Sequence, residues 1–290
     1  MNLVFRLADS LHSAGLQFFR FRHESAFAYR LLLIGAFAAF TGISAQVRIP
    51  LPFTPVPITA QVFVVLLSGA LLGRTLGPLS QAVYVCAGAA GLPWFAPKAG
   101  EGFFTRGGWG VITGVTGGYL ISYPFAALLV GFVVDRYVRY RSFTPILLTL
   151  LGGVLVIYAF GTVQLAAVLG VGPGDAMIYA AVPFVPGDVL KAVIAALILS
   201  GVAPRVAFNG EVDAGARQEL GLAMVDRAFI IMLLIGVWVL VPAVQIAYPS
   251  KIAWVIYYSA AATAATASTL VALGARAWLK RAGARLSWMK

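Results

Sequence analysis

The stretch Pro183-Phe184-Val185-Pro186-Gly187-Asp188-Val189-Leu190-Lys191 lies within a long apolar segment and decides how the chain is built. Two prolines three residues apart cannot sit in an unbroken helix, because each lacks a backbone donor and clashes with the preceding turn. A broken helix at membrane depth is tolerated only where it is buried in protein or lines a cavity. The stretch therefore predicts a break, a new helix from Asp188 to about Ser200, and a cavity beside it.

The composition of the whole chain is that of a membrane protein. Of its 290 residues 61% are hydrophobic and 11% are charged, and the mean hydropathy is +0.92. A soluble domain carries about 25% charged residues. The net charge of +11 would favour nucleic acid for a soluble protein, but the cations here lie at the ends of apolar runs. Such cations fix orientation and meet anionic lipid, so we expect membrane lipid and no nucleic acid as a partner.

Eight apolar segments predict an all-α polytopic membrane protein. They lie near residues 28–47, 60–73, 76–93, 109–134, 143–169, 176–202, 228–247 and 252–274. Only Gly73-Arg74-Thr75 separates the second from the third, which predicts a tight helical hairpin. With a cytoplasmic N-terminus, sixteen of the 21 Lys and Arg residues fall in cytoplasmic segments and four outside. This positive-inside bias favours a multi-pass protein of the cytoplasmic (inner) membrane with both termini in the cytoplasm.

These segments divide the chain into four predicted parts. Residues 1–27 form an amphipathic segment at the membrane surface, and residues 28–204 form a six-helix body. Residues 205–227 are a polar cytoplasmic linker, and residues 228–290 form a C-terminal extension of two transmembrane helices without an assigned role.

Away from the ends of the predicted spans of the body, Asp188 and Lys191 are the only acid and base. Ionisable residues inside a membrane are costly to bury and mark functional sites, and a spacing of i, i+3 places both on one helix face. We place this face in the outer half of the membrane as a ligand site. The alternative is structural, with Asp188 capping the helix and Lys191 neutralising it.

Further candidates are polar, aromatic or small side chains near the ends of the spans. The candidates for ligand binding are the polar and aromatic residues Thr59, Gln61, Gln81, Tyr84, Trp94, Thr116 and Tyr119, together with Gly117. For the glutamines the alternative is an interhelical hydrogen bond, and for the Gly117-Gly118 pair it is close helix packing. Small residues recur along the first span at Gly35, Ala38, Ala39 and Gly42. They form a docking face for a helix of the same chain or of another subunit.

The sequence lacks the patterns of an enzyme. It has no Walker A motif, so ATP hydrolysis by this chain is not expected, and no serine, histidine and aspartate are placed for nucleophilic catalysis. The two histidines and the one cysteine have no cluster of metal-ligating residues near them, so we expect no metal site. We expect no cofactor.

Six blocks in order resemble the BioY family, the biotin-specific S components of energy-coupling-factor (ECF) transporters. The blocks are AQVRIPL (45–51), PITAQ (57–61), LGPLSQAVY (76–84), GLPWFA (91–96), TGGYL (116–120) and FVPGDVLK (184–191). Two features depart from the family pattern: Val115 stands where the family usually has proline, and residues 205–290 extend beyond the usual family length.

The resemblance implies a six-helix body that binds biotin in a pocket open to the outside. It also implies an ECF transmembrane coupling subunit and two ATPase subunits, which alone use ATP, with the small-residue face of the first helix docking on the membrane subunit. For biotin, Lys191 suits the carboxylate, and Asp188, Gln61 or Gln81 suits the ureido ring, although the two ends could be exchanged.

Aromatic side chains and one loop complete the expected site. Tyr84, Tyr119 and Trp94 would support the apolar part of biotin, and the loop Lys98–Gly108 would act as a lid. Two other functions stay open: an S component for another carboxylate-bearing vitamin, and a self-sufficient secondary transporter in which Asp188 and Lys191 exchange a proton.

Overall fold

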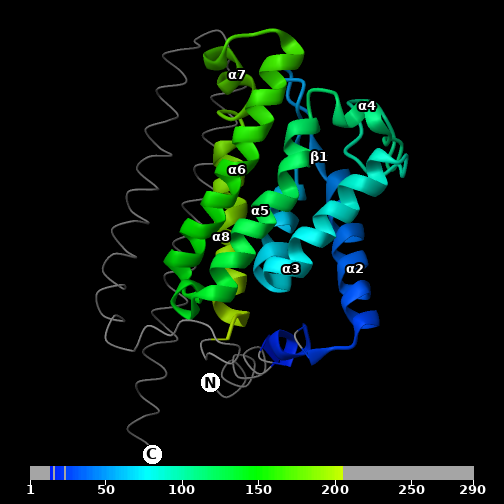
Figure 1. Cartoon of the computed structure of the whole chain (residues 1–290). Coiled ribbons are helices and arrows are strands. Elements are labelled where there is room, and N and C mark those ends of the chain that lie inside the picture. The colour runs from blue at the N-terminus through cyan, green and yellow to red at the C-terminus, as the bar shows by residue number, and fades with distance from the viewer. Residues whose placement is uncertain (1–13, 16, 23, 205–290) are drawn as a thin grey trace, which may run out of the picture. The chain divides into compact units, whose positions relative to one another are not determined.

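The computed structural model describes residues 14–15, 17–22 and 24–204, and these are mostly helical (Figure 1). The helices are α2 (Phe27–Gln46), α3 (Gln61–Ala89), α4 (Trp109–Ile112), α5 (Gly117–Arg136), η1 (a 3-10 helix, Val138–Arg141), α6 (Phe143–Leu169), α7 (Pro173–Ala180) and α8 (Val185–Val202). The all-helical prediction missed one small element, an antiparallel pair of two-residue strands, β1 (Arg48–Ile49) and β2 (Ile58–Thr59).

Five of these helices, α2, α3, α5, α6 and α8, are long and apolar enough to cross a membrane. This agrees with the multi-pass membrane class that composition predicts. Residues 1–13 of the predicted amphipathic segment, the linker 205–227 and the C-terminal extension 228–290 lie outside the described residues. The prediction of two further spans therefore stays a prediction.

Helix α3 contains two arms that fold back on each other at Gly73. The backbone of Gly73 has φ 80° and ψ −172°, a conformation that glycine adopts without steric cost. The side chains of Ser68 and Gln81 are hydrogen-bonded at 3.0 Å although they are 13 residues apart, a separation of about 20 Å in a straight helix. The hairpin predicted at Gly73-Arg74-Thr75 is thus confirmed.

The predicted sixth span is broken, but the break lies earlier than the prolines suggested. Helix α7 ends at Ala180, and α8 begins at Val185 rather than at Asp188. Proline is tolerated in a first helical turn, where its missing N–H has no intrahelical partner, so Pro186 lies inside α8. The Asp188 N–H already donates to the Phe184 carbonyl at 2.9 Å, so Asp188 belongs to the helix proper.

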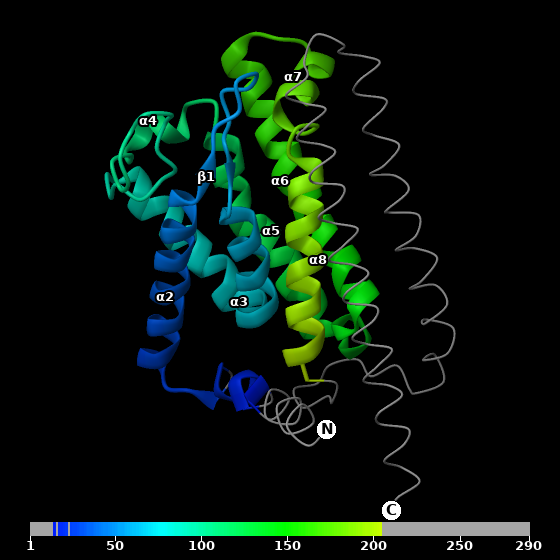
Figure 2. The same ribbon diagram turned by 180° about the vertical axis from the view of Figure 1, so that it is seen from behind.

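The predicted fourth span is also divided. The short helix α4 is followed by a turn at residues 113–116, and α5 begins at Gly117. Figures 1 and 2 show that α4, the β1–β2 pair and α7 lie at one end of the bundle, and residues 14–22 lie at the other end. The two helix breaks and the strand pair therefore meet at the same end of the body.

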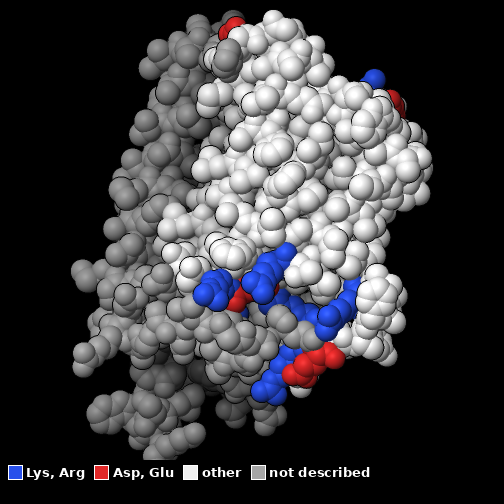
Figure 3. All heavy atoms as spheres, viewed as in Figure 1, with Lys and Arg blue, Asp and Glu red and all other residues white. Residues whose placement is uncertain are grey.

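At the opposite end, residues of the N-terminal segment pack against the body. Arg22 is buried, forms an ion pair with Asp135, and donates to the Leu71 carbonyl at 2.8 Å. The Asp135 carboxylate also accepts the Arg74 N–H at 2.9 Å. The ring of Phe19 lies 4.3 Å from the Arg22 guanidinium carbon. This end is where Lys and Arg gather on the face drawn in Figure 3, whereas the middle of that face is white and shows no charged side chain.

Candidate functional site

A cavity lies where the two helix breaks and the β1–β2 pair meet. The empty space within it, including the part that opens to solvent, measures about 590 Å³. Its wall is mostly apolar and aromatic, which is typical of a small-molecule site. The lining residues are Val56, Pro57, Ile58, Thr59, Gln61, Val62, Phe95, Ala96, Val111, Thr116, Tyr119, Leu120, Tyr123, Ile157, Tyr158, Phe184, Asp188 and Lys191.

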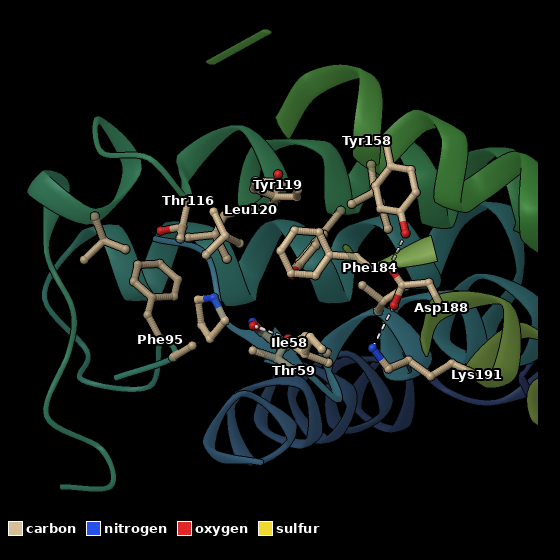
Figure 4. A pocket seen from close by; sticks show the side chains of 18 residues that line it. Ile58, Thr59, Phe95, Thr116, Tyr119, Leu120, Tyr158, Phe184, Asp188 and Lys191 are labelled. Carbon is tan, nitrogen blue, oxygen red and sulfur yellow. Dashed lines mark hydrogen bonds and ion pairs between the residues drawn. The ribbon is translucent and has the colours of Figure 1, made fainter. Parts of the chain in front are cut away.

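One end of the cavity carries its two charged residues. Lys191 Nζ lies 2.7 Å from Asp188 Oδ1, and the Tyr158 hydroxyl donates to Asp188 Oδ2 at 2.8 Å (Figure 4). Asp188 is 2% exposed, and the side chain of Lys191 is 18% exposed. A buried carboxylate is stable only when it is paired and hydrogen-bonded, and here both of its oxygens are engaged.

This geometry argues against the capping alternative for Asp188. Its carboxylate contacts two side chains, and α8 has no side-chain hydrogen bond at its N-cap. The ammonium of Lys191 has three N–H donors, of which Asp188 accepts one. Because Lys191 lines the cavity, it presents a positive charge to a ligand there.

Thr59 and Gln61 form a polar part of the wall at the start of α3. The Thr59 hydroxyl donates to Gln61 Oε1 at 3.1 Å, and Gln61 Nε2 donates to the Tyr84 hydroxyl at 2.7 Å. Both ends of the Gln61 amide are therefore held, and its orientation is set by its neighbours.

The end of the cavity remote from Lys191 contains Thr116 and Phe95, as Figure 4 shows. The Thr116 hydroxyl oxygen is buried and has no protein hydrogen-bond partner. A buried polar group without a partner costs free energy, so this hydroxyl is a candidate ligand contact. It lies just before α5, in the second helix break, and Thr116 is one of the residues that line the cavity.

Tyr119 and Phe184 give the cavity an aromatic wall. Their rings lie edge to face with centroids 6.5 Å apart. The Tyr119 hydroxyl donates to the Ala180 carbonyl at 2.6 Å, so its ring rather than its hydroxyl is available to a ligand. Gly161 makes room for this ring, because a Cβ there would lie 2.3 Å from it.

Six predicted site residues thus line the cavity together: Thr59, Gln61, Thr116, Tyr119, Asp188 and Lys191. Four others do not line it: Gln81, Tyr84, Trp94 and Gly117. Gln81 makes hydrogen bonds to Thr41 and Ser68, which is the interhelical alternative. A Cβ at Gly117 would lie 1.7 Å from the Ile112 carbonyl oxygen, so that glycine permits close backbone packing.

Tyr84 and Trp94 stand behind the cavity wall rather than in it. Tyr84 is fully buried, and its contacts with the lining residues are a hydrogen bond from Gln61 and ring packing on Phe95 and Tyr123. The Trp94 indole donates to the Tyr84 carbonyl at 3.0 Å. Neither ring faces the space that a ligand would occupy.

Sequence reasoning assigned no role to Tyr158, Tyr123, Phe95 or Phe184, which all line the cavity. Tyr158 lies within α6, whose hydropathy of 2.3 is the highest of the five candidate spans. A hydroxyl in such an apolar helix needs a partner. That signal alone could have marked Tyr158 as a candidate, although not its pairing with Asp188.

The BioY family model matches residues 18–208 of this chain. The chain belongs to the BioY family. The resemblance inferred from six sequence blocks is thereby confirmed, and the match spans every described helix from α2 to α8, including all the cavity residues.

Curated BioY proteins from distant organisms are similar over nearly their full length. A probable biotin transporter BioY of Methanothermobacter thermautotrophicus is 40% identical over an alignment of 159 residues, and the alignment covers 51% of this chain and 94% of the relative. One from Pyrococcus horikoshii is 40% identical over 171 residues, 59% of this chain and 94% of the relative. The biotin transporter BioY of Rhizobium etli is 34% identical and is covered to 89%.

The fold also matches a solved structure. A crystal structure of the S component for biotin from an ECF-type ABC transporter aligns with a TM-score of 0.53 and 26% identity. The alignment covers 60% of this chain and 89% of that chain. The BioY body of this protein therefore has the S-component fold.

Within the BioY body, the small-residue stripe of α2 divides between two faces. Ala38 and Gly42 are buried, and a Cβ at Gly42 would lie 3.1 Å from the Trp94 side chain. Gly35 and Ala39 are exposed, and a Cβ at Gly35 would meet nothing within 4 Å. Of the four predicted docking residues, two thus pack inside the body and two are exposed on its surface.

The predicted lid loop Lys98–Gly108 contributes no lining residue, although Phe95 and Ala96 just before it do. Phe103 at its tip is 72% exposed. The loop is held at Phe104, whose N–H donates to Gln46 Oε1 at 2.9 Å.

Proposed function

We propose that this chain captures biotin from outside the cell with high affinity. In this proposal it is the substrate-specific S component of an ECF-type, ATP-driven importer of the cytoplasmic membrane. The observation that carries the proposal is the Asp188–Lys191 pair in a mostly apolar and aromatic cavity of a chain of the BioY family. The curated relatives are biotin transporters, and the matching solved structure is an S component for biotin.

The chemistry of the cavity suits biotin. Its carboxylate requires a cation, which Lys191 supplies, and a charge-assisted hydrogen bond of this kind is about twice as strong as a neutral one. Its ureido ring has N–H donors and a carbonyl that match the acceptors and donors of Asp188, Gln61 and Thr59. Its apolar bicycle and chain fit the rings of Tyr119 and Phe184.

Energy for import comes from partner subunits in this proposal. The partners are an ECF transmembrane coupling subunit and two ATPase subunits, and this chain itself uses no cofactor. The exposed Gly35 and Ala39 on α2 are the docking residues, because small side chains allow two helix backbones to approach closely in a membrane.

The proposed orientation places both termini in the cytoplasm. In the described part of the chain, three exposed arginines lie in the N-terminal segment, at the hairpin turn of α3 and at the last residue of α5: Arg20, Arg74 and Arg136. The N-terminal segment lies at the end of the bundle opposite α4, α7 and the strand pair (Figure 1). A cytoplasmic position of this end follows the positive-inside rule, and the cavity then opens toward the outside. The extension 228–290 has no proposed role beyond its two predicted spans.

The first experiment is equilibrium binding of labelled biotin to the purified, detergent-solubilised chain. The Lys191→Ala and Asp188→Ala variants are measured beside it, with their fold checked by circular dichroism and gel filtration. Tight binding that both variants lose would support capture at this cavity. A well-folded wild type that binds no biotin would refute the assignment, and other carboxylate-bearing vitamins would then be screened.

The second experiment distinguishes the coupling mechanism. Biotin uptake is measured in cells that express the chain with and without ECF coupling subunits, and in the presence of a protonophore. Uptake that depends on the coupling subunits supports the proposal. Uptake that persists without any ATPase but stops with the protonophore would instead favour the secondary-transporter alternative.

A further inference from the structure

A connected set of hydrogen bonds runs from the cavity wall into the protein behind it. It begins at Gln61, whose Nε2 donates to the buried Tyr84 hydroxyl at 2.7 Å. Tyr84 is in turn fixed to Trp94, because the Trp94 indole donates to the Tyr84 carbonyl at 3.0 Å and the ring centroids lie 5.2 Å apart. The Tyr84 hydroxyl also reaches the Trp94 carbonyl oxygen at 3.5 Å.

The Trp94 carbonyl oxygen also accepts a hydrogen bond from Gln46, the last residue of α2. Gln46 Nε2 donates to the Trp94 carbonyl at 3.2 Å and to the Gly42 carbonyl at 3.0 Å. Gln46 Oε1 accepts the Phe104 N–H at 2.9 Å. The buried amide of Gln46 therefore joins three segments: the end of α2, the residue beside the cavity-lining Phe95, and the loop Lys98–Gly108.

The loop needs such an attachment. Phe104 has φ 53° and is the only non-glycine residue with positive φ in the part of the chain that the structure describes. This conformation is unfavourable for a bulky side chain, and it persists only when surrounding contacts hold it. The hydrogen bond from Phe104 to Gln46 is such a contact.

Neither Tyr84 nor Gln46 lines the cavity. Tyr84 restrains Gln61, which does line it, and Gln46 restrains the Trp94 carbonyl, which lies next to the lining residue Phe95. A ligand binds more tightly to a polar group whose orientation is already fixed, because less rotational freedom is lost on binding. Without the Tyr84 hydroxyl, the Gln61 amide would keep only its bond from Thr59 and would gain rotational freedom.

We infer that Tyr84 and Gln46 are positioning residues for biotin binding. Tyr84 orients the Gln61 amide at the cavity wall. Gln46 ties this network to the loop Lys98–Gly108, so that the loop and the bound ligand stabilise each other. The inference rests on the proposed function, because the affinity for biotin is the quantity that shows whether Gln61 is correctly oriented.

The affinity test is a double-mutant cycle between Tyr84→Phe and Gln61→Met. Tyr84→Phe keeps the ring that packs on Trp94, Phe95 and Tyr123 and removes only the hydroxyl. Loss of one such hydrogen bond is expected to weaken biotin binding about five- to tenfold. In the Gln61→Met background the same change is expected to have less than about a twofold effect, as coupled residues require.

A purely structural role for Tyr84 predicts a different result. The affinity would then fall by the same factor in both backgrounds, and this outcome would overturn the inference. No change in affinity on Tyr84→Phe in the wild-type background, with biotin binding intact, would overturn it as well.

The loop test needs no ligand. Hydrogen exchange of peptides that cover residues 98–108 is measured by mass spectrometry in the wild type, Gln46→Met and Tyr84→Phe. Because Gln46 protects the Phe104 N–H, its loss is expected to speed exchange of that amide about fivefold or more. Tyr84→Phe is expected to speed it by a smaller factor, and bound biotin is expected to slow it in the wild type only.

The control variant is Gln81→Met, which removes another buried glutamine of the body that lies outside this network. It is expected to leave exchange in the loop unchanged. If Gln46→Met or Tyr84→Phe also leaves it unchanged, the inference is wrong. If the variants speed exchange as expected but the wild type binds no biotin, the network stands and the proposed function fails.

Discussion

The hydroxyl of Tyr158 lies 2.8 Å from Oδ2 of Asp188, although the two residues are 30 positions apart and belong to different helices. Lys191 holds the other carboxylate oxygen at 2.7 Å. A buried carboxylate with both oxygens engaged keeps its position when a ligand arrives. Asp188 in turn fixes the position of the Lys191 ammonium at the cavity wall. The first two predictions follow from this arrangement.

Lys191→Met is expected to weaken biotin binding by a factor of about one hundred or more. The substitution removes the cation for the ligand carboxylate. It also leaves the buried Asp188 without its ionic partner, which costs about 3–5 kcal/mol of stability when such a pair is broken. The measurement is equilibrium binding of labelled biotin in detergent. Lys98→Met, at an exposed lysine of the loop, is the matched control and should bind like the wild type. Equal affinities for all three proteins would contradict the prediction.

Tyr158→Phe is expected to weaken biotin binding about tenfold while the protein stays folded. The variant keeps the ring in the cavity wall but removes the hydrogen bond to Asp188, and hydrogen bonds to charged groups contribute about 1.5–3 kcal/mol. Isothermal titration calorimetry measures the change. Tyr29→Phe removes a hydroxyl from an exposed tyrosine and serves as the control. A Tyr158→Phe variant with wild-type affinity would show that Asp188 needs no second partner.

Two neighbouring alanines of α2 are expected to respond differently to enlargement. Ala39→Leu, on the exposed face, should leave biotin binding and thermal stability unchanged but abolish uptake that depends on the coupling subunits. Ala38→Leu, at a position that is 1% exposed, should instead lower stability by about 1–3 kcal/mol through overpacking. Co-purification with the coupling subunits, together with thermal unfolding, separates the two effects. Normal co-purification of Ala39→Leu would argue against docking through this face.

Gly73→Ala is expected to destabilise the body by about 2 kcal/mol or more. The backbone φ of 80° disfavours any residue with a Cβ, and the added Cβ would lie 2.3 Å from the Asp135 carboxylate that pairs with Arg22. Thermal unfolding in detergent measures the loss. Gly35→Ala is the control, because that helical position has open space around it and should tolerate or favour alanine. Equal melting temperatures for both variants would show that the hairpin turn accommodates the side chain.

The hairpin at Gly73 and the break before α8 illustrate what local pattern predicts well. Only Gly73-Arg74-Thr75 separates two apolar segments. Such a short connection predicts that the chain reverses direction there and forms a tight helical hairpin. The two prolines required a break near residues 183–186, but its position depended on which neighbours could accept the freed backbone groups. The chain stops α7 at Ala180 and starts α8 at Val185, because proline in a first turn costs little.

The residues that line the cavity could not all be predicted from local sequence. Gln81, Tyr84 and Trp94 are polar or aromatic residues in the right blocks, yet none of them lines the cavity, whereas Tyr158 does. A membrane helix can present a polar side chain to a ligand or to a neighbouring helix with the same local sequence. The rotation of the helix about its axis decides between them, and that rotation is set by packing with distant segments.

The sequence by itself determined that this chain is a multi-pass helical membrane protein with a broken span and an acid–base pair, because hydropathy, proline chemistry and charge act over a few neighbouring residues. Tertiary structure alone decided that Tyr158 completes the pair, that Gln61 rather than Gln81 faces the cavity, and that only Gly35 and Ala39 of the α2 stripe stay exposed. These outcomes depend on contacts between residues tens of positions apart, which fix how each helix is rotated and what it packs against.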